Sequence, residues 1–263
     1  MVRGGGRPGF GGRDRGSSLA ALVPERGRFR WPRTAGTRTR RRREAAAKPL
    51  VCPGLLCVLA FRQGRQDDSV ARNEAALGAA TAIADRSVEA LAYVGLSRVS
   101  LRAGDYQRVC SLAERARDLV AGAPGNEQVM PLHLHAAGMR LLGNYDRARS
   151  LYLQNLELSL RLDDTFMIAM ELHNLGHVEV HRGNVEAARA YFRDCSALRE
   201  GSAIPYDLAM EHLNRAVIAW CEGERKVALE ELTQAEKSLA QAEIVLDPDD
   251  RFEVDWLKAR LTE

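Results

Sequence analysis

The stretch that decides the fold runs from Leu172 to Cys195 and reads LHNLGHVEVHRGNVEAARAYFRDC. Gly183 within it belongs to a set of glycines that return at steps of 40, 39, 40 and 40 residues. The members of this set, which we call the turn glycines, are Gly64, Gly104, Gly143, Gly183 and Gly223. A period this regular predicts five copies of one supersecondary unit, and repeats of this kind stack into a solenoid.

Compact side chains return at fixed positions around each turn glycine. In the copy around Gly183 they are Gly176, Ala188 and Cys195, which stand seven residues before and five and twelve residues after it. Small side chains let two helix backbones approach closely, so these positions predict helix crossings. The larger apolar residues between them are three and four residues apart, which is a helical spacing.

Each turn glycine is expected to end a helix, because a positive φ costs little only for a residue without Cβ. Asp105, Asn144 and Asn184 directly follow their glycines and are good N-cap residues for a second helix. Helix-breaking clusters separate the copies at residues 122–126, 162–164, 201–205 and 247–250. No segment shows sustained period-two alternation, so the sequence predicts an all-α chain of helix-turn-helix units with essentially no sheet.

Three central copies carry a family resemblance. Residues 172–176 (LHNLG), 183–188 (GNVEAA) and 143–148 (GNYDRA), with Phe192 and Tyr152, resemble the tetratricopeptide (TPR) repeat. The period exceeds the usual TPR length of about 34 residues, and repeats near 40 resemble sensor and scaffold arrays of bacterial transcription activators and signalling ATPases. The resemblance covers about residues 50 to 250. It implies a right-handed superhelical solenoid of about five hairpins with a concave groove.

The two ends of the chain differ from this repeat array. Residues 251–263 form half a repeat, which predicts a C-terminal capping helix, and a fragment of a longer array is the alternative. Residues 1–49 contain 13 Arg and 1 Lys against 3 acidic residues, while the remainder has a net charge of −8. Such a Gly/Arg-rich segment predicts a disordered arm. The arm either contacts nucleic acid through phosphates or reflects a translation start upstream of the real one.

The apolar run from Leu50 to Phe61 is too short to span a membrane and falls into register with the later repeats, so we interpret it as a core helix. The chain contains 5 Cys, an odd and scattered set that argues against a disulfide framework and for a reducing compartment. The sequence therefore predicts a cytoplasmic protein.

The sharpest local pattern is His173, His177 and His181, spaced four and four on one helix face. In TPR arrays the positions ten, six and two residues before the turn glycine line the concave groove. The candidate groove residues at these positions are Arg98, Arg102, His133, His173, His177 and His181. Arg140 is a further candidate, as are Asn174 and Asn214, which stand one period apart. Hydrogen bonding inside the stack is the alternative role for Asn174 and Asn214.

No cofactor, metal or catalytic step is expected. The three histidines span about 12 Å along the helix axis, too far for one ion to bind all three. If their pKa values stay near 6.5, they gain charge together below about pH 6 and repel one another. The chain has no P-loop, G-x-S-x-G or H-E-x-x-H motif, so it is predicted not to be an enzyme.

The predicted role is therefore a regulatory protein-protein interaction scaffold that binds a partner segment in the groove. Two alternatives remain open at this point. The array could sense a small ligand or another domain, as in bacterial transcriptional regulators, or the arm at residues 1–49 could bind nucleic acid.

Overall fold

The computed structural model describes residue 61 and residues 64–263. Within these residues every helix or strand assigned is an α-helix, in the order α2 (Gln66–Ala82), α3 (Arg86–Arg102), α4 (Tyr106–Leu119), α5 (Gly125–Leu141), α6 (Tyr145–Leu162), α7 (Thr165–His181), α8 (Val185–Leu198), α9 (Pro205–Cys221), α10 (Arg225–Gln241) and α11 (Pro248–Thr262). The prediction of an all-α repeat fold is confirmed. The predicted arm at residues 1–49, most of the run at residues 50–61, Cys52 and Cys57 lie outside the described residues.

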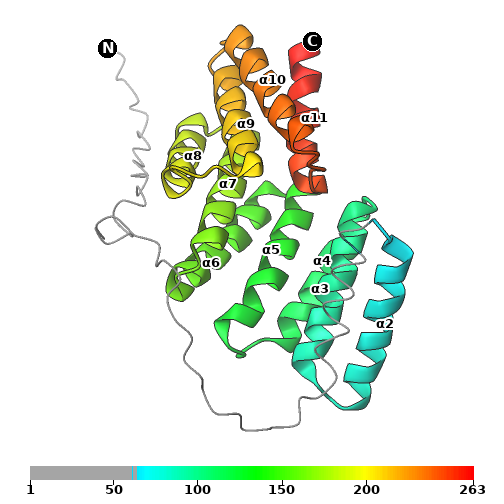
Figure 1. Ribbon diagram of the computed structural model, residues 1–263. Helices are drawn as coiled ribbons and strands as arrows, with labels where there is room; N and C mark the ends of the chain where they lie inside the picture. The colour runs from blue at the N-terminus through cyan, green and yellow to red at the C-terminus, as the bar shows by residue number, and fades with distance from the viewer. Residues whose placement is uncertain (1–60, 62–63) are drawn as a thin grey trace, which may run out of the picture. The chain divides into compact units, whose positions relative to one another are not determined.

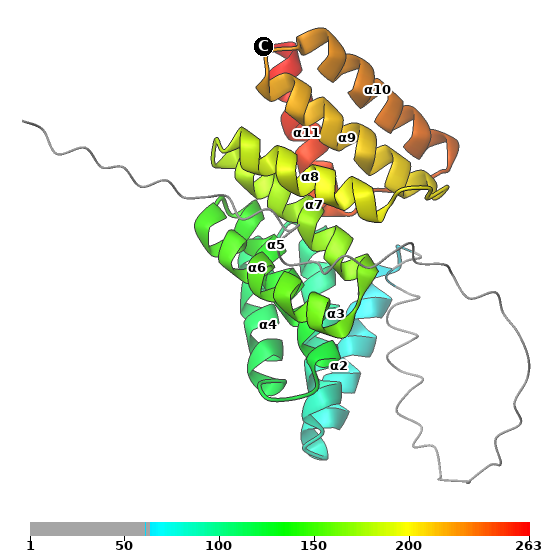
Figure 2. The same ribbon diagram turned by 90° about the vertical axis from the view of Figure 1, so that its left-hand side faces the viewer.

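The helices follow one another as hairpins that stack in chain order (Figure 1). The hairpins are α3/α4, α5/α6, α7/α8 and α9/α10, and α2 packs against α3. First helices of successive hairpins also touch, since α3 contacts α5 and α7 contacts α9. Figure 2 shows the same succession from the side. This pattern of neighbours is that of a helical repeat solenoid.

The turn glycines end helices through backbone hydrogen bonds. Their φ angles lie between +74° and +79°, where a residue without Cβ is favoured. After α3, the Gly104 N–H donates to the Leu101 carbonyl at 3.1 Å and the Asp105 N–H donates to the Ser100 carbonyl at 3.0 Å. This pair of bonds is the Schellman motif, which satisfies carbonyls that the helix end leaves open.

Two of the three expected caps use their side chains as caps. Asp105 and Asn144 each accept a hydrogen bond from the backbone N–H three residues on. Asn184 occupies the N-cap position of α8 but makes no such bond. Its amide instead donates to Glu179 Oε2 at 2.7 Å. Glu179 also accepts hydrogen bonds from Arg149 and Arg182, so three side chains donate to this one carboxylate.

Compact residues lie at the crossings. A Cβ built on Gly176 of α7 would stand 2.2 Å from Phe192 Cε1 of α8, so only glycine fits there without a shift of the ring. Ala148, Ala188 and Ala228, each five residues after a turn glycine, are all 0% exposed. The hairpins therefore close on small side chains.

Helix α11 begins earlier than the sequence predicts. Residues 247–250 were interpreted as a break and the C-terminal helix as residues 251–263, but α11 starts at Pro248. Proline suits the first helical position, because its missing N–H has no partner there and its φ is already helical. The earlier start brings Asp249 and Asp250 into the first turn of α11. Among the described helices, none combines the length and the apolar character needed to cross a bilayer.

Candidate functional site

One side of α11 is apolar and packs against α9 and α10. Val254 and Leu257 are 2% and 0% exposed and join an apolar cluster that includes Met210 and Leu213 of α9. Figure 1 shows α11 running beside these helices, with its start near α5. These apolar contacts are what the proposed capping role requires.

A second side of α11 carries buried acidic residues. Asp249, Asp250 and Glu253 are 8%, 5% and 0% exposed. Residues at i, i+1 and i+4 fall on neighbouring parts of one helix surface. Burying three carboxylates is costly unless cations or hydrogen-bond donors meet them.

Arg140 of α5 is the cation that meets two of these acids. It is 0% exposed, although it has one of the largest side chains among the fully buried residues. Its Nη1 donates to Glu253 Oε1 at 2.9 Å, and its Nη2 donates to Asp249 Oδ2 at 3.4 Å. Guanidinium stays charged at any ordinary pH. Arg140 therefore contributes a permanent positive charge to the contact between α5 and α11.

The three histidines of α7 meet the same acids. His181 Nε2 lies 2.9 Å and His177 Nδ1 lies 3.3 Å from Glu253 Oε2. His173 Nε2 lies 3.4 Å from Asp250 Oδ1. The rings of His173 and His177 contact each other edge to face, with centroids 4.6 Å apart. The spacing of four therefore aligns the imidazoles along α11, as the helical period predicts.

Tyr206 at the start of α9 completes the set, since its hydroxyl donates to Asp250 Oδ2. We call the residues that hold the acids of α11 the α11 seat: Arg140, His173, His177, His181 and Tyr206. The seat draws on α5, α7 and α9, so it exists only after three hairpins have stacked.

Aromatic contacts extend the seat along α11. Trp256 lies edge-on to His181 at 4.9 Å and to Trp220 at 5.0 Å between ring centroids. His181 is stacked on Tyr145 at 4.8 Å with an interplanar angle of 5°. The Arg260 guanidinium lies 4.5 Å from the Trp256 ring centroid. Trp256 is therefore an anchor that combines apolar area with directional ring contacts.

Charge pairing sets the protonation of the acids. Burial alone raises the pKa of Glu253, but the attraction of His177 and Arg140 and the hydrogen bond with His181 hold it well below its ordinary value. Burial likewise acts against ionisation of Asp250, whose pKa is nevertheless lowered, chiefly by His173 and Tyr206. Burial and the neighbouring Asp250 raise the pKa of Asp249, which Arg140 only partly offsets. Among the three buried acids, Glu253 and Asp250 are thus the two whose charged form the neighbouring groups favour.

The expectation that the three histidines become charged together is wrong for His173. Burial lowers the pKa of His173 from 6.5 to about 4, and the attraction of Asp250 does not make up for it. This imidazole is therefore neutral at pH 6. Each of the three rings also lies beside an acid, which opposes the repulsion that the sequence predicted.

His133 of α5 belongs to a neighbouring buried pair. Its Nδ1 lies 2.8 Å from Glu171 Oε1 of α7, which also accepts from Asn155 at 3.0 Å. Burial lowers the pKa of His133, but the Glu171 carboxylate more than offsets this and the net pKa is raised. His133 therefore ties α5 to α7, and the charge of Asp249 of α11 also acts on it.

The remaining predicted residues divide into two pairs. Asn174 and Asn214 are 2% and 3% exposed, and their side-chain oxygens accept no hydrogen bond from the described residues. Arg98 and Arg102 of α3 are partly exposed. Arg102 donates to the carbonyl of residue 61 at 3.1 Å and lies 3.3 Å from Asp247, just before α11. The predicted set is therefore brought onto the first helices of successive hairpins, and most of it is buried.

Sequence reasoning missed the acids that face this set. In the sequence these acids fall in the predicted break and capping helix, and no pattern there singles out Tyr206 or Trp256. The available signal was the i, i+1, i+4 spacing of the acids beside the apolar Val254. That spacing predicts an amphipathic helix with one acidic stripe.

Other chemistry has little support in the described part of the chain. No group of three His, Cys, Asp or Glu side chains there has an arrangement that could hold a metal ion. Cys110, Cys195 and Cys221 are free thiols, and burial raises the pKa of Cys110 to about 11. A thiol with so high a pKa is a poor nucleophile.

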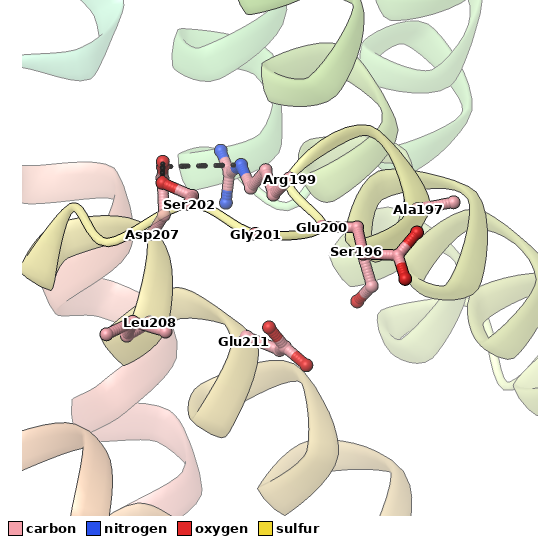
Figure 3. Close-up of a pocket in the computed structure, with 9 residues that line it drawn as sticks. All are labelled: Ser196, Ala197, Arg199, Glu200, Gly201, Ser202, Asp207, Leu208 and Glu211. Atoms are coloured by element: carbon pink, nitrogen blue, oxygen red, sulfur yellow. Dashed lines mark hydrogen bonds and ion pairs between the residues drawn. The ribbon is translucent and has the colours of Figure 1, made fainter. Parts of the chain in front are cut away.

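A pocket of about 420 Å³ opens where α8 connects to α9 (Figure 3). Its lining residues are Ser196, Ala197, Arg199, Glu200, Gly201, Ser202, Asp207, Leu208 and Glu211. Arg199 Nε lies 3.4 Å from Asp207 Oδ1, and the Ser202 hydroxyl donates to Asp207 Oδ2 at 2.7 Å. Arg199 and Asp207 thus form an ion pair, and Arg199 Nη1 is buried without a hydrogen-bond partner among the described residues.

Comparison with known proteins shows the fold. No protein-family model matches the chain, and no curated protein matches it. BtubC (BKLC) from P. vanneervenii is similar with a TM-score of 0.59 at 21% identity, over 74% of this chain and 81% of that one. A kinesin light chain with TPR-like repeats from Podosopora anserina has a TM-score of 0.57 at 16% identity, over 74% and 97%.

A Rap protein complexed with competence and sporulation factor is similar with a TM-score of 0.61 at 18% identity, over 79% of this chain and 57% of that one. These likenesses show a TPR-like helical repeat fold, which confirms the resemblance at the level of fold.

Proposed function

We propose that this chain is a regulatory protein-interaction scaffold without a catalytic step, which binds a helical, acidic segment of a partner on the first helices of its hairpins. The observation that carries the proposal is that an acidic helix, α11, already lies on this surface and is held there by ion pairs. The proposed partner segment uses Arg98 and Arg102 of α3 together with the α11 seat.

The chemistry of the surface supports this class of partner. Arg140 and the histidines of the seat offer cationic and hydrogen-bonding groups in a place that excludes water. Charge pairs gain strength when water is excluded, and a planar guanidinium binds a carboxylate only in a restricted geometry. Buried charge pairs of this kind give specificity more than raw affinity.

The fold supports a binding role as well. A structure of a Rap protein that shares this fold contains competence and sporulation factor. Repeat arrays present extended surfaces to their partners, because each hairpin adds one more helix to the same face. By this analogy a partner segment would run across several first helices here.

Affinity capture by the full chain tests the proposal. Arg98→Ala/Arg102→Ala removes two cations from the first-helix surface. The matched variant Arg161→Ala/Arg193→Ala removes two exposed cations from α6 and α8, which are second helices. We expect the first variant to retain its helix content but to lose at least about 10-fold of the partner that the wild-type chain and the matched variant capture. Equal capture by all three chains would rule out this surface as the binding site.

A further inference from the structure

We propose that α11 is a resident stand-in for the partner, so that the α11 seat recognises an incoming helix with the pattern Asp-Asp-x-x-Glu-Val-x-Trp-Leu or its chemical equivalent. That helix has to displace α11, and the chain is therefore self-blocked in its resting state. This inference rests on the proposed function, because it specifies the partner of the same surface.

The composition of α11 favours recognition over simple capping. A helix that only covers the end of a solenoid needs an apolar inner side and a polar outer side. Val254 and Leu257 provide the apolar part, yet Asp249, Asp250 and Glu253 are buried as well. Replacing buried ion pairs by apolar side chains is often neutral or stabilising, so these acids are a poor choice for stability alone. They do fix the register of α11 on α5 and α7.

The seat is only partly satisfied by α11. Arg140 Nε, His173 Nδ1 and His177 Nε2 are buried and have no hydrogen-bond partner among the described residues. His177 Nδ1 and His173 Nε2 lie at ion-pair distance from their acids without hydrogen-bond alignment. A partner helix with better-placed acceptors would gain these bonds and so compete with α11.

The connection before α11 suits a displaceable helix. Residues 242–247 join α10 to α11 without helical structure, and Glu243 has φ +54°, which is unfavourable for a residue with a Cβ. This short tether keeps α11 at an effective concentration on the order of millimolar near its seat. An untethered helix must overcome this advantage, so any change that weakens α11 raises the apparent affinity for the partner.

The apolar contacts predict an exchange of one helix for another. If α11 leaves, Met210 and Leu213 of α9 lose the cover of Val254 and Leu257. Exposed apolar surface is unfavourable, so the empty seat is not a stable end state. The incoming helix must therefore supply apolar residues and a Trp-like anchor at the places of these residues and Trp256.

Binding of a labelled peptide to the full chain tests the inference. The probe is a fluorescein-labelled synthetic peptide with the sequence of residues 246–263. The test variant is the full chain with Asp249→Asn/Asp250→Asn/Glu253→Gln, which weakens the resident helix. The matched variant is Glu243→Gln/Asp255→Asn/Glu263→Gln, which removes three exposed acids from the same part of the chain.

We expect the test variant to bind the probe at least about 10-fold more tightly than the wild-type chain and the matched variant do, since its tethered competitor is weakened. A further Arg140→Gln substitution in the test variant should remove this gain. A probe with its own three acids neutralised should not bind. Equal affinity of the wild-type, test and matched chains, whether tight or absent, would overturn the inference.

A second measurement covers the case in which the test variant fails to fold, as judged by its circular dichroism. Hydrogen exchange is then followed in the ¹⁵N-labelled wild-type chain, so that its own α11 is distinguished from added peptide. Excess unlabelled peptide should speed exchange in α11 and leave α6 unchanged. Unchanged exchange in α11 would overturn the inference.

The two proposals fail in different ways. If capture depends on Arg98 and Arg102 but the peptide never displaces α11, the scaffold proposal stands and the stand-in role of α11 is wrong. If the peptide displaces α11 but capture ignores the two arginines, the seat exchanges helices and the α3 part of the proposed surface is wrong.

Discussion

The contact between α4 and α5 and the contact between α11 and its seat are both buried, but they are built from opposite materials. Between α4 and α5, Val109, Ala113 and Leu134 are 0%, 0% and 2% exposed and form one apolar cluster. Under α11, Arg140 and Glu253 are both 0% exposed and carry opposite charges. The first contact joins successive hairpins, whereas the second joins the hairpins to a helix that ends the described chain.

The two contacts differ in how their free energy depends on the exact partner. Apolar contact gains free energy in proportion to area and tolerates small shifts. A buried ion pair gains little net free energy but strongly penalises a mismatched partner. The α4/α5 contact is therefore of the kind that holds hairpins together, and the α11 contact is of the kind that we propose for partner recognition.

The largest expected effect comes from a substitution in the apolar contact between α4 and α5. Leu134→Ala leaves a cavity between α4 and α5, and we expect the free energy of unfolding to fall by about 2–5 kcal/mol. Urea denaturation measures this loss. The matched variant Leu91→Ala changes a leucine that is 65% exposed on α3, and should shift stability by no more than about 0.5 kcal/mol. Similar losses in both variants would contradict the assignment of this contact as core.

A smaller effect concerns the α11 seat and is the pH dependence of the free energy of unfolding. His173 has a folded pKa of about 4 and an unfolded pKa near 6.5. Between these values the unfolded chain binds more protons at His173, so His173 makes the free energy of unfolding fall as pH falls. From pH 7 to pH 5 we expect a loss on the order of 2 kcal/mol from this group. Asp250, His177 and Arg199 are the charged or titratable groups that act on it.

His173→Gln should remove this part of the pH dependence while other titrating groups act in both chains. The measurement is the free energy of unfolding at pH 7 and pH 5 for each chain. Leu91→Ala, which changes an exposed and uncharged side chain, should keep the wild-type dependence. If His173→Gln and wild type respond equally to pH, His173 is not a buried neutral group.

The smallest expected effect comes from replacing two helical glycines, one at the contact between α4 and α5 and one in open space. A Cβ on Gly138 of α5 would stand 2.6 Å from Cys110 Sγ and 3.0 Å from Val109 Cγ1 of α4, whereas a Cβ on Gly78 of α2 meets nothing within 4 Å. Gly138→Ala gains about 1 kcal/mol of helix propensity but loses roughly 1–3 kcal/mol to crowding, for a net loss of about 1 kcal/mol. Gly78→Ala should raise stability by up to about 1 kcal/mol. Thermal melts of both variants test whether the signs are opposite.

The repeat signal made most of the fold predictable. The turn glycines, the small residues at crossings and the helical spacing of apolar residues are all local or periodic features. They can therefore be read from a single sequence without knowledge of tertiary contacts. The candidate residues His173, His177 and His181 were also found, because their helix face follows from the period, and Arg140 was among the candidates. The acids that meet them were not found, because Glu253 lies 113 residues from Arg140 in the chain and no period links the two.

Asn184 shows the same limit on a smaller scale. Its type and its position after Gly183 predict a side-chain cap, and it does occupy the N-cap position of α8. Its amide donates to Glu179, a carboxylate that also accepts from Arg149 of the preceding hairpin. Residue type and position in the repeat did not predict this side-chain partner.

The sequence by itself determined the helices, the turns that join them and the face on which the three histidines stand, because these depend on neighbours within one repeat. Only the tertiary structure decided that α11 covers this face and that its acids neutralise the buried cation. The reason is physical: the free energy of a buried charge depends on which opposite charge reaches it through space, and chain order does not specify that partner.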